Sequence, residues 1–230
     1  MTTKRVAGVV LALAVVAGLS HLVPTALESS GPLVVVWKGA GVALLAGYAA
    51  LLARTADGWL VALVMLCGAA GDVLIESTGF IAGAGAFAAG HALAVVLYLR
   101  NRRPGRPAGR LVGLVIVVGA AVAIWLVAES TPITVYVTLL IGMAVTAWLS
   151  RFPWALTGFG AIMFVISDAL IFLRRDVLSG SIAAAVATWG LYFVGQLLIV
   201  LGVTRTLGGT AARSTTSASL LDTAAPTRLG

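Results

Sequence analysis

The sequence predicts an all-α, polytopic membrane protein, and three observations support this fold class. Hydrophobic residues make up 60% of the 230 residues and charged residues only 10%, far from the balance of a soluble domain. The apolar residues form runs of about 17 to 23, the length that a helix needs to cross a hydrocarbon core of roughly 30 Å. Strands of a membrane barrel would be about 10 residues long with alternating polarity, so we expect a helical bundle instead.

Eight candidate spans are separated by short polar breaks or breaks that contain Pro and Gly. The first, residues 6–23, follows two basic residues as a signal peptide would, but it lacks a convincing small-x-small cleavage site, so we expect a retained helix. The other seven spans cover residues 33–53, 59–75, 80–99, 111–128, 133–149, 154–173 and 181–203.

The basic residues predict the orientation. With the N-terminus in the cytoplasm, twelve Lys and Arg residues fall on the cytoplasmic side, whereas Arg174 and Arg175 fall on the other. An even number of spans then predicts that both termini are cytoplasmic. The loop RNRRPGRPAGR at residues 100–110 is the centre of this positive charge. Because it has no interleaved aromatic residues and its charge suits a cytoplasmic loop, we expect no nucleic-acid partner.

The chain is expected to form one transmembrane domain, residues 1–206, followed by a disordered cytoplasmic tail. Residues 207–230 are small, polar and poor in apolar surface, which is typical of a segment that does not fold alone. A single cysteine, Cys67, and two histidines give no disulfide framework and no three-histidine zinc site. We therefore predict no metal and no cofactor, and the sequence indicates no oligomeric state.

Two aspartates stand inside apolar runs, Asp72 in GAAGDVLI and Asp168 in FVISDALI. A charge at the middle of a span costs at least about 2.5 to 3.5 kcal/mol on insertion scales, so such residues normally face the bundle interior and find partners. Counting about 1.5 Å of rise per residue places six polar residues roughly 13 to 24 Å from the cytoplasmic ends of their spans. We predict that they share one polar cavity: Lys38, Asp72, His91, Asp168, Tyr192 and Gln196.

The aspartates also suggest an internal repeat. Each lies near the outer end of an outward span, and the following span carries an aromatic residue followed four residues later by a polar one, Phe87/His91 or Tyr192/Gln196. We expect two four-helix repeats related by an axis along the membrane normal.

Structural roles compete with functional ones at several of these positions. Lys38 could extend to the outer interface, and His91 could be a neutral core histidine. Tyr192 and Gln196 could serve only to form hydrogen bonds between helices. Glu76, one turn beyond Asp72, is interpreted as the outer end of its helix.

These residues lie in motifs that resemble the YhhN family of eight-span membrane proteins, whose animal members are lysoplasmalogenases. The similarity covers most of residues 33–203 and rests on WKGAG, AAGDVLI, FIAGAGAFAAGH, GAIMFVISD and YFVGQLLIVLG. One departure is that Lys38 is followed by Gly39, where the family commonly has Pro. The resemblance implies a hydrolase that cleaves the vinyl ether of a lysoplasmalogen, a lysophospholipid, to a fatty aldehyde and a glycerophospho-head group.

The chemistry of this reaction suits a pair of carboxyl groups. A vinyl ether accepts a proton on carbon, and the resulting oxocarbenium ion accepts water, so one carboxylic acid and one carboxylate can divide the two steps as in glycoside hydrolysis. In a low-dielectric cavity two nearby carboxyls do not both ionise readily. We hypothesise that Asp72 and Asp168 are the acid and base, and that Lys38, His91, Ser167, Tyr192 and Gln196 bind substrate, water or the ionised carboxylate.

Two other functions use the same residues. A proton-coupled transporter or lipid flippase would carry protons or a cation on the aspartates between the two repeats. A non-catalytic scaffold would tolerate replacement of both aspartates. The expected location in every case is the cell membrane.

Overall fold

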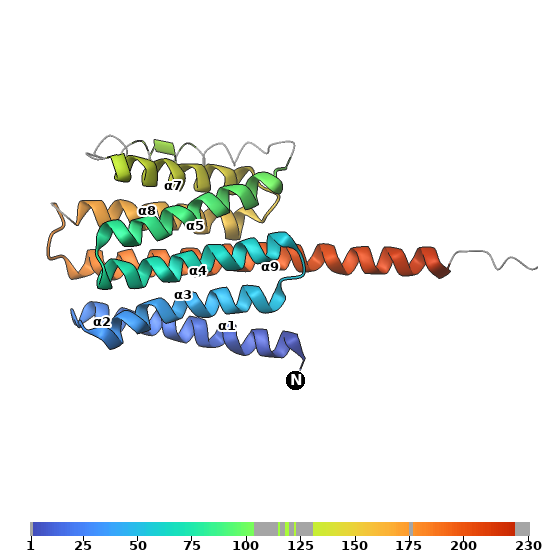
Figure 1. Cartoon of the computed structure of the whole chain (residues 1–230), viewed down its shortest axis with the longest axis horizontal. Helices are drawn as coiled ribbons and strands as arrows, with labels where there is room; N and C mark the ends of the chain where they lie inside the picture. The colour runs from blue at the N-terminus through green and yellow to red at the C-terminus, as the bar shows by residue number, and fades with distance from the viewer. Residues whose placement is uncertain are drawn as a thin grey trace, which may run out of the picture.

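The computed structural model describes residues 2–103, 131–174 and 177–223, together with Val115, Val118, Gly119 and Val122; beyond Gly209 it describes the backbone alone. Figure 1 shows a bundle of roughly parallel helices that lie side by side. They are α1 (Thr3–Ser20), α2 (Leu22–Ala26), α3 (Pro32–Leu52), α4 (Ala56–Ser77), α5 (Phe80–Arg100), α7 (Thr131–Leu149), the π-helix η1 (Trp154–Gly158), α8 (Phe159–Leu173) and α9 (Ile182–Thr223).

Seven helical segments in this described part are long and apolar enough to cross a membrane. Two of them combine short elements, α1 with α2 and η1 with α8. Each overlaps one of the predicted spans, because hydrophobic length is the property that both depend on. The protein is thus a multi-pass, all-helical membrane protein.

The predicted span at residues 111–128 lies outside the described residues, as does most of the basic loop before it. The helices on either side run in the same direction, because their C-terminal ends meet: Arg103 N donates to the Leu149 carbonyl (3.1 Å), and Arg151 Nε donates to Asn101 Oδ1 (2.7 Å). Two parallel neighbours need a connection that returns to the other end of the bundle. The parallel course of α5 and α7 suits the eight-span count. That count, the repeats and the orientation stay predictions.

Helix α9 is longer than predicted. It continues in helical conformation to Thr223, through much of the segment expected to be a disordered tail. Figure 1 shows its last part projecting beyond the other helices, at the end of the bundle where the N-terminus lies. The domain boundary at residue 206 stays a prediction.

Local sequence explains where the central helices begin and turn. The Thr55 hydroxyl caps α4 by accepting from Gly58 N (3.3 Å), as an N-cap residue does. Gly79 then allows the sharp reversal into α5, because its φ of 115° is one that other residues rarely adopt. At the opposite end, Asp57 accepts from Arg100 Nε (2.7 Å) and Asn101 Nδ2 (2.8 Å), which fastens the start of α4 to the end of α5.

The first helix is fastened by two tryptophans. Trp37 Nε1 on α3 donates to the Ala17 carbonyl (3.1 Å), and Trp189 Nε1 on α9 donates to the Gly18 carbonyl (2.7 Å). Gly18 leaves room for the ring of Phe193, since a Cβ there would lie 2.0 Å from it. Small residues at helix contacts let membrane helices approach closely, and α1 joins the bundle in this way.

A contact of backbone against backbone joins α8 and α9 and leads to a test. A Cβ on Gly195 would lie 2.7 Å from the Gly160 carbonyl oxygen, which is backbone and cannot simply rotate away. Gly195→Ala should therefore lower the free energy of unfolding in detergent by about 1 to 3 kcal/mol, the usual cost of overpacking. The matched control is Gly85→Ala on α5, where a Cβ meets nothing within 4 Å. Equal thermal stability of the two variants would contradict this packing.

Candidate active site

A cavity of about 790 Å³ opens between the helices at the end of the bundle that carries α2. From the mouth inward, the residues that line it are first charged or polar and exposed, then apolar, then polar and buried. Solvent-exposed polar residues line the mouth, namely Glu28, Ser29, Ser30, Glu76, Ser77 and Arg174. Apolar side chains that include Val35, Ile75, Ala84, Phe87, Ile171 and Phe172 line the walls, and the buried polar lining residues are His21, Asp72, Tyr136, Ser167, Asp168, Thr188 and Tyr192.

Asp72 reaches this cavity from α4 and is only 3% exposed. Its Oδ2 accepts a hydrogen bond of 2.9 Å from the Tyr192 hydroxyl, which comes from α9. The preceding Gly71 leaves space for the Phe87 ring of α5, because a Cβ there would lie 2.6 Å from that ring. Three helices therefore fix the carboxyl at the inner part of the cavity.

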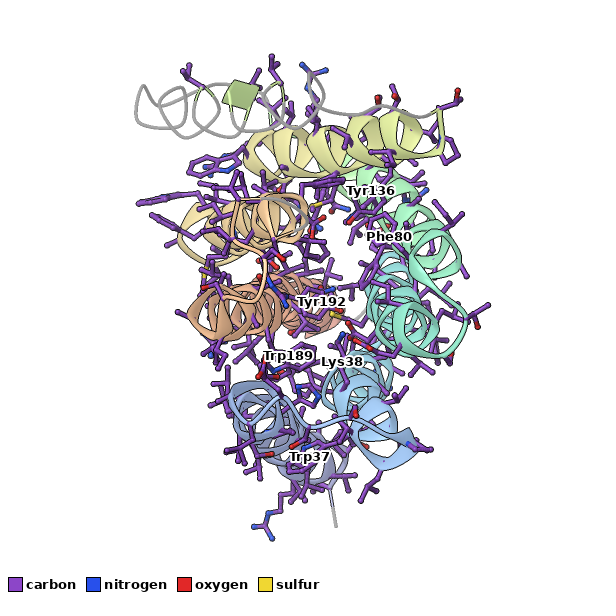
Figure 2. All side chains as sticks on the ribbon, turned by 90° about the vertical axis from the view of Figure 1, so that its left-hand side faces the viewer. Trp37, Lys38, Phe80, Tyr136, Trp189 and Tyr192 are labelled. Carbon is purple, nitrogen blue, oxygen red and sulfur yellow. The ribbon has the colours of Figure 1, made fainter. Side chains whose placement is uncertain are left out.

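Asp168 reaches the same cavity from α8 and is 4% exposed. Its Oδ2 accepts a short hydrogen bond from the Tyr136 hydroxyl, which comes from α7. Figure 2, which looks along the helices from the end that carries α2, shows Tyr136 and Tyr192 between the helices, in the bundle interior. The two aspartates thus line one cavity, and each is hydrogen-bonded to a tyrosine of another helix.

Lys38 also lines this cavity, but its hydrogen bond goes to Glu76 rather than to an aspartate. The Lys38 Nζ to Glu76 Oε1 distance is 2.7 Å, and the two side chains are 20% and 46% exposed. The sequence was interpreted to give Glu76 no role beyond marking the end of α4. The structure shows that Glu76 also pairs with Lys38 of α3. Lys38 remains close enough to Asp72 to act on it electrostatically.

Ser167 lines the cavity beside Asp168, yet its hydroxyl donates to the Thr188 carbonyl (2.9 Å). Thr188 in turn donates to the Ala184 carbonyl (2.7 Å). The Ser167 bond holds α8 against α9 next to the aspartate, whereas the Thr188 bond lies within α9. Ser167 therefore stabilises the wall of the site in this state.

His91 and Gln196 lie elsewhere than predicted. They line a second, small cavity of about 20 Å³ whose lining residues are all buried. Phe87 lines both cavities, and Phe164 packs between His91 (ring centroids 5.0 Å apart) and Tyr192 (5.2 Å). An aromatic layer thus separates these two residues from the aspartates' cavity.

Two residues of the large cavity were missed at the sequence level. Tyr136 lies roughly 20 Å along α7 from its Leu149 end at 1.5 Å per residue, so the depth count could have included it. His21, at the junction of α1 and α2, is buried beside Trp189, with ring centroids 4.5 Å apart. It lies at the weakly polar end of the first span, a segment that was interpreted only as a retained helix rather than a signal peptide.

No group of three or more His, Cys, Asp or Glu side chains that could hold a metal ion occurs within residues 2–103, 131–174 and 177–209. The site as described brings two carboxyls, two phenols and a lysine around an amphipathic cavity. Carboxyl groups in such surroundings can exchange a proton with a bound molecule.

The Tyr136–Asp168 hydrogen bond generates a prediction about stability. Removing one member of a buried hydrogen bond leaves the other without a partner, at a cost of about 1 to 3 kcal/mol. In a double-mutant cycle with Tyr136→Phe and Asp168→Asn, we expect a coupling energy of about 1 kcal/mol or more from thermal unfolding in detergent. Tyr136→Phe combined with Met65→Leu, a core residue outside both cavities, should be additive. Additivity in both cycles would contradict the bond.

Comparison with known proteins agrees with this architecture. The model of the YhhN family matches residues 33–203. Two curated relatives named lysoplasmalogenase, from Mycobacterium bovis (strain ATCC BAA-935 / AF2122/97) and Mycobacterium tuberculosis (strain CDC 1551 / Oshkosh), are each 33% identical over 157 residues. The match covers 63% of this chain and 59% of each relative, so the chain spans about three-fifths of their length. No solved structure matches. The chain belongs to the YhhN family.

Proposed function

We propose that this protein is a hydrolase of the cell membrane that cleaves the vinyl ether bond of a lysoplasmalogen-type lysophospholipid. One observation carries the proposal: a single amphipathic cavity is lined by two buried aspartates, each hydrogen-bonded to a tyrosine. The relatives named lysoplasmalogenase support the same reaction class.

The cavity suits a lipid with one chain and a polar head. Its volume of about 790 Å³ lies within the range of small-molecule sites, roughly 300 to 1,000 Å³. The apolar walls would take the vinyl ether and the first part of the alkenyl chain. At the mouth, Lys38 and Arg174 offer positive charge for a phosphate, and Glu28 and Glu76 offer negative charge for an amine.

The aspartates would perform the reaction in two proton transfers. One, protonated, gives its proton to the vinyl carbon remote from the ether oxygen, so that positive charge develops on the other carbon and on oxygen. The second, ionised, takes a proton from water while the water oxygen bonds to that charged carbon. Collapse of the hemiacetal then breaks the carbon–oxygen bond: its hydroxyl proton returns to the first aspartate, and the second protonates the departing glycerol oxygen.

The tyrosines and Lys38 would keep the two carboxyls in their separate roles. A phenol that donates to a carboxylate oxygen stabilises it and fixes its direction, which is the positioning that acid–base catalysis needs. Lys38 provides positive charge on the Asp72 side of the cavity. Ser167 and Thr188 hold the wall beside Asp168.

A transporter or flippase would use the same aspartates, and the test must separate these functions. The glycine-containing helices α3 and α5 are continuous over Pro32–Leu52 and Phe80–Arg100. Discontinuous helices are common around substrate sites of secondary transporters. This continuity favours the hydrolase.

Purified protein in detergent, given a lysoplasmenyl-ethanolamine, should release fatty aldehyde without any membrane gradient. Asp72→Asn and Asp168→Asn should each lower kcat by at least about 100-fold, because general acid–base catalysis contributes roughly 10² to 10⁴. Cys67→Ala, which removes a side chain that lines neither cavity, is the control and should keep the wild-type rate.

Full activity in both Asn variants would rule out the acid–base pair. Gradient-driven lipid uptake into proteoliposomes without aldehyde release would favour the transporter. Unchanged stability and cell growth after replacement of both aspartates, with neither activity, would favour the scaffold.

A further inference from the structure

The small cavity behind the aspartates carries a feature that the proposed reaction leaves unexplained. His91 is 4% exposed and lines this cavity, yet its Nε2 has no hydrogen-bond partner among the described residues. A buried polar atom without a partner lowers the stability of the folded protein. Buried polar groups in native proteins are normally satisfied, by protein or by ordered water.

The cavity has room for one water molecule and offers it polar partners. A site needs about 10 to 15 Å³ of accessible volume to hold a water, and this cavity has about 20 Å³. Gln196, only 3% exposed, lines it as well and brings a side-chain amide. Two polar partners are the minimum for an ordered buried water, and His91 with Gln196 supply them.

Gln196 connects this cavity to the catalytic one. Its amide and the Tyr192 hydroxyl both lie over Gly68, where a Cβ would be 2.9 Å from Gln196 Nε2 and 3.2 Å from the Tyr192 hydroxyl, so the two groups are close neighbours. The Tyr192 hydroxyl donates to Asp72 Oδ2 at 2.9 Å. A continuous polar route therefore runs from the small cavity to one of the two aspartates.

We propose that one ordered water in the small cavity bridges His91 Nε2 and the Gln196 amide, and thereby anchors the polar chain Gln196–Tyr192–Asp72. His91 is then a positioning residue. It lies behind the Phe87 and Phe164 rings, does not line the substrate cavity, and acts on Asp72 through the water, Gln196 and Tyr192. The kinetic part of this proposal rests on the proposed hydrolase function, whereas the water site does not.

The water itself is tested by a high-resolution structure of the wild-type protein in lipid nanodiscs. We expect one density peak within hydrogen-bond distance of both His91 Nε2 and the Gln196 amide, and its loss in His91→Phe. A small cavity without that peak in the wild-type protein overturns the proposal. This experiment needs no activity assay, so its result holds whether or not the protein hydrolyses vinyl ethers.

The positioning role is tested by aldehyde release from lysoplasmenyl-ethanolamine. His91→Phe should lower kcat by about three- to tenfold, the equivalent of one hydrogen bond, and leave KM within about twofold because the substrate does not touch His91. His91→Gln, which can still hold a water, should restore most of kcat. Met65→Leu, a core change outside both cavities, should leave both constants unchanged.

Two outcomes overturn this role: a wild-type kcat in His91→Phe, or an equal loss of kcat in His91→Gln and His91→Phe. If His91→Phe does not fold, Gln196→Met removes the other partner of the water at similar volume and should show the same fall in kcat at constant KM. A wild-type protein that releases no aldehyde refutes the proposed hydrolase and leaves the density peak to decide the water site.

Discussion

Burial of two carboxyl groups in a membrane bundle is the constraint on which the rest of the structure depends. Neither Asp72 nor Asp168 is more than 4% exposed, so each needs a hydrogen-bond donor within the bundle. Each obtains it from a tyrosine on another helix: Tyr192 joins α9 to α4, and Tyr136 joins α7 to α8. The bonds that satisfy the carboxyls therefore also tie helices together, and α4 and α9 are far apart in sequence.

The aromatic residues around these bonds lie between the large cavity and the small one. Phe87 and Phe164 make edge-to-face contacts with Tyr192, with ring centroids 5.7 and 5.2 Å apart, and close the inner side of the large cavity. On the outer side the charges of the mouth meet solvent. A cationic intermediate formed in this cavity would be stabilised by fixed carboxyl and phenol dipoles rather than by bulk water.

Hydropathy and helix signals in the sequence predicted the spans of the described helices to within a few residues, except at the C-terminal end of α9, because span length depends on local composition. Depth along each helix was also predictable, since it needs only the rise per residue. The same count placed His91 and Gln196 roughly 7 Å below Asp72, but it was interpreted as one shared cavity, whereas the structure places these two residues at a second cavity.

Rotation and pairing could not be predicted, because they depend on how helices pack against neighbours from elsewhere in the chain. No sequence pattern favours Glu76 over an aspartate as the partner of Lys38, or Tyr136 over Ser167 as the donor to Asp168. Gly160 and Gly195 show why: their close approach fixes α8 against α9, and this contact is visible only once both helices are placed.

The central claim is that the vinyl ether reacts between the two aspartates. A saturated alkyl-ether lysophosphoethanolamine has the same shape but no double bond to protonate, so it should remain bound without reacting. A structure of this complex tests the claim most directly. We predict that the ether oxygen lies in the large cavity within reach of both Asp72 and Asp168, with the phosphate near Lys38 or Arg174. A lipid bound only on the outer surface of the bundle, with the cavity free of it, would contradict the account.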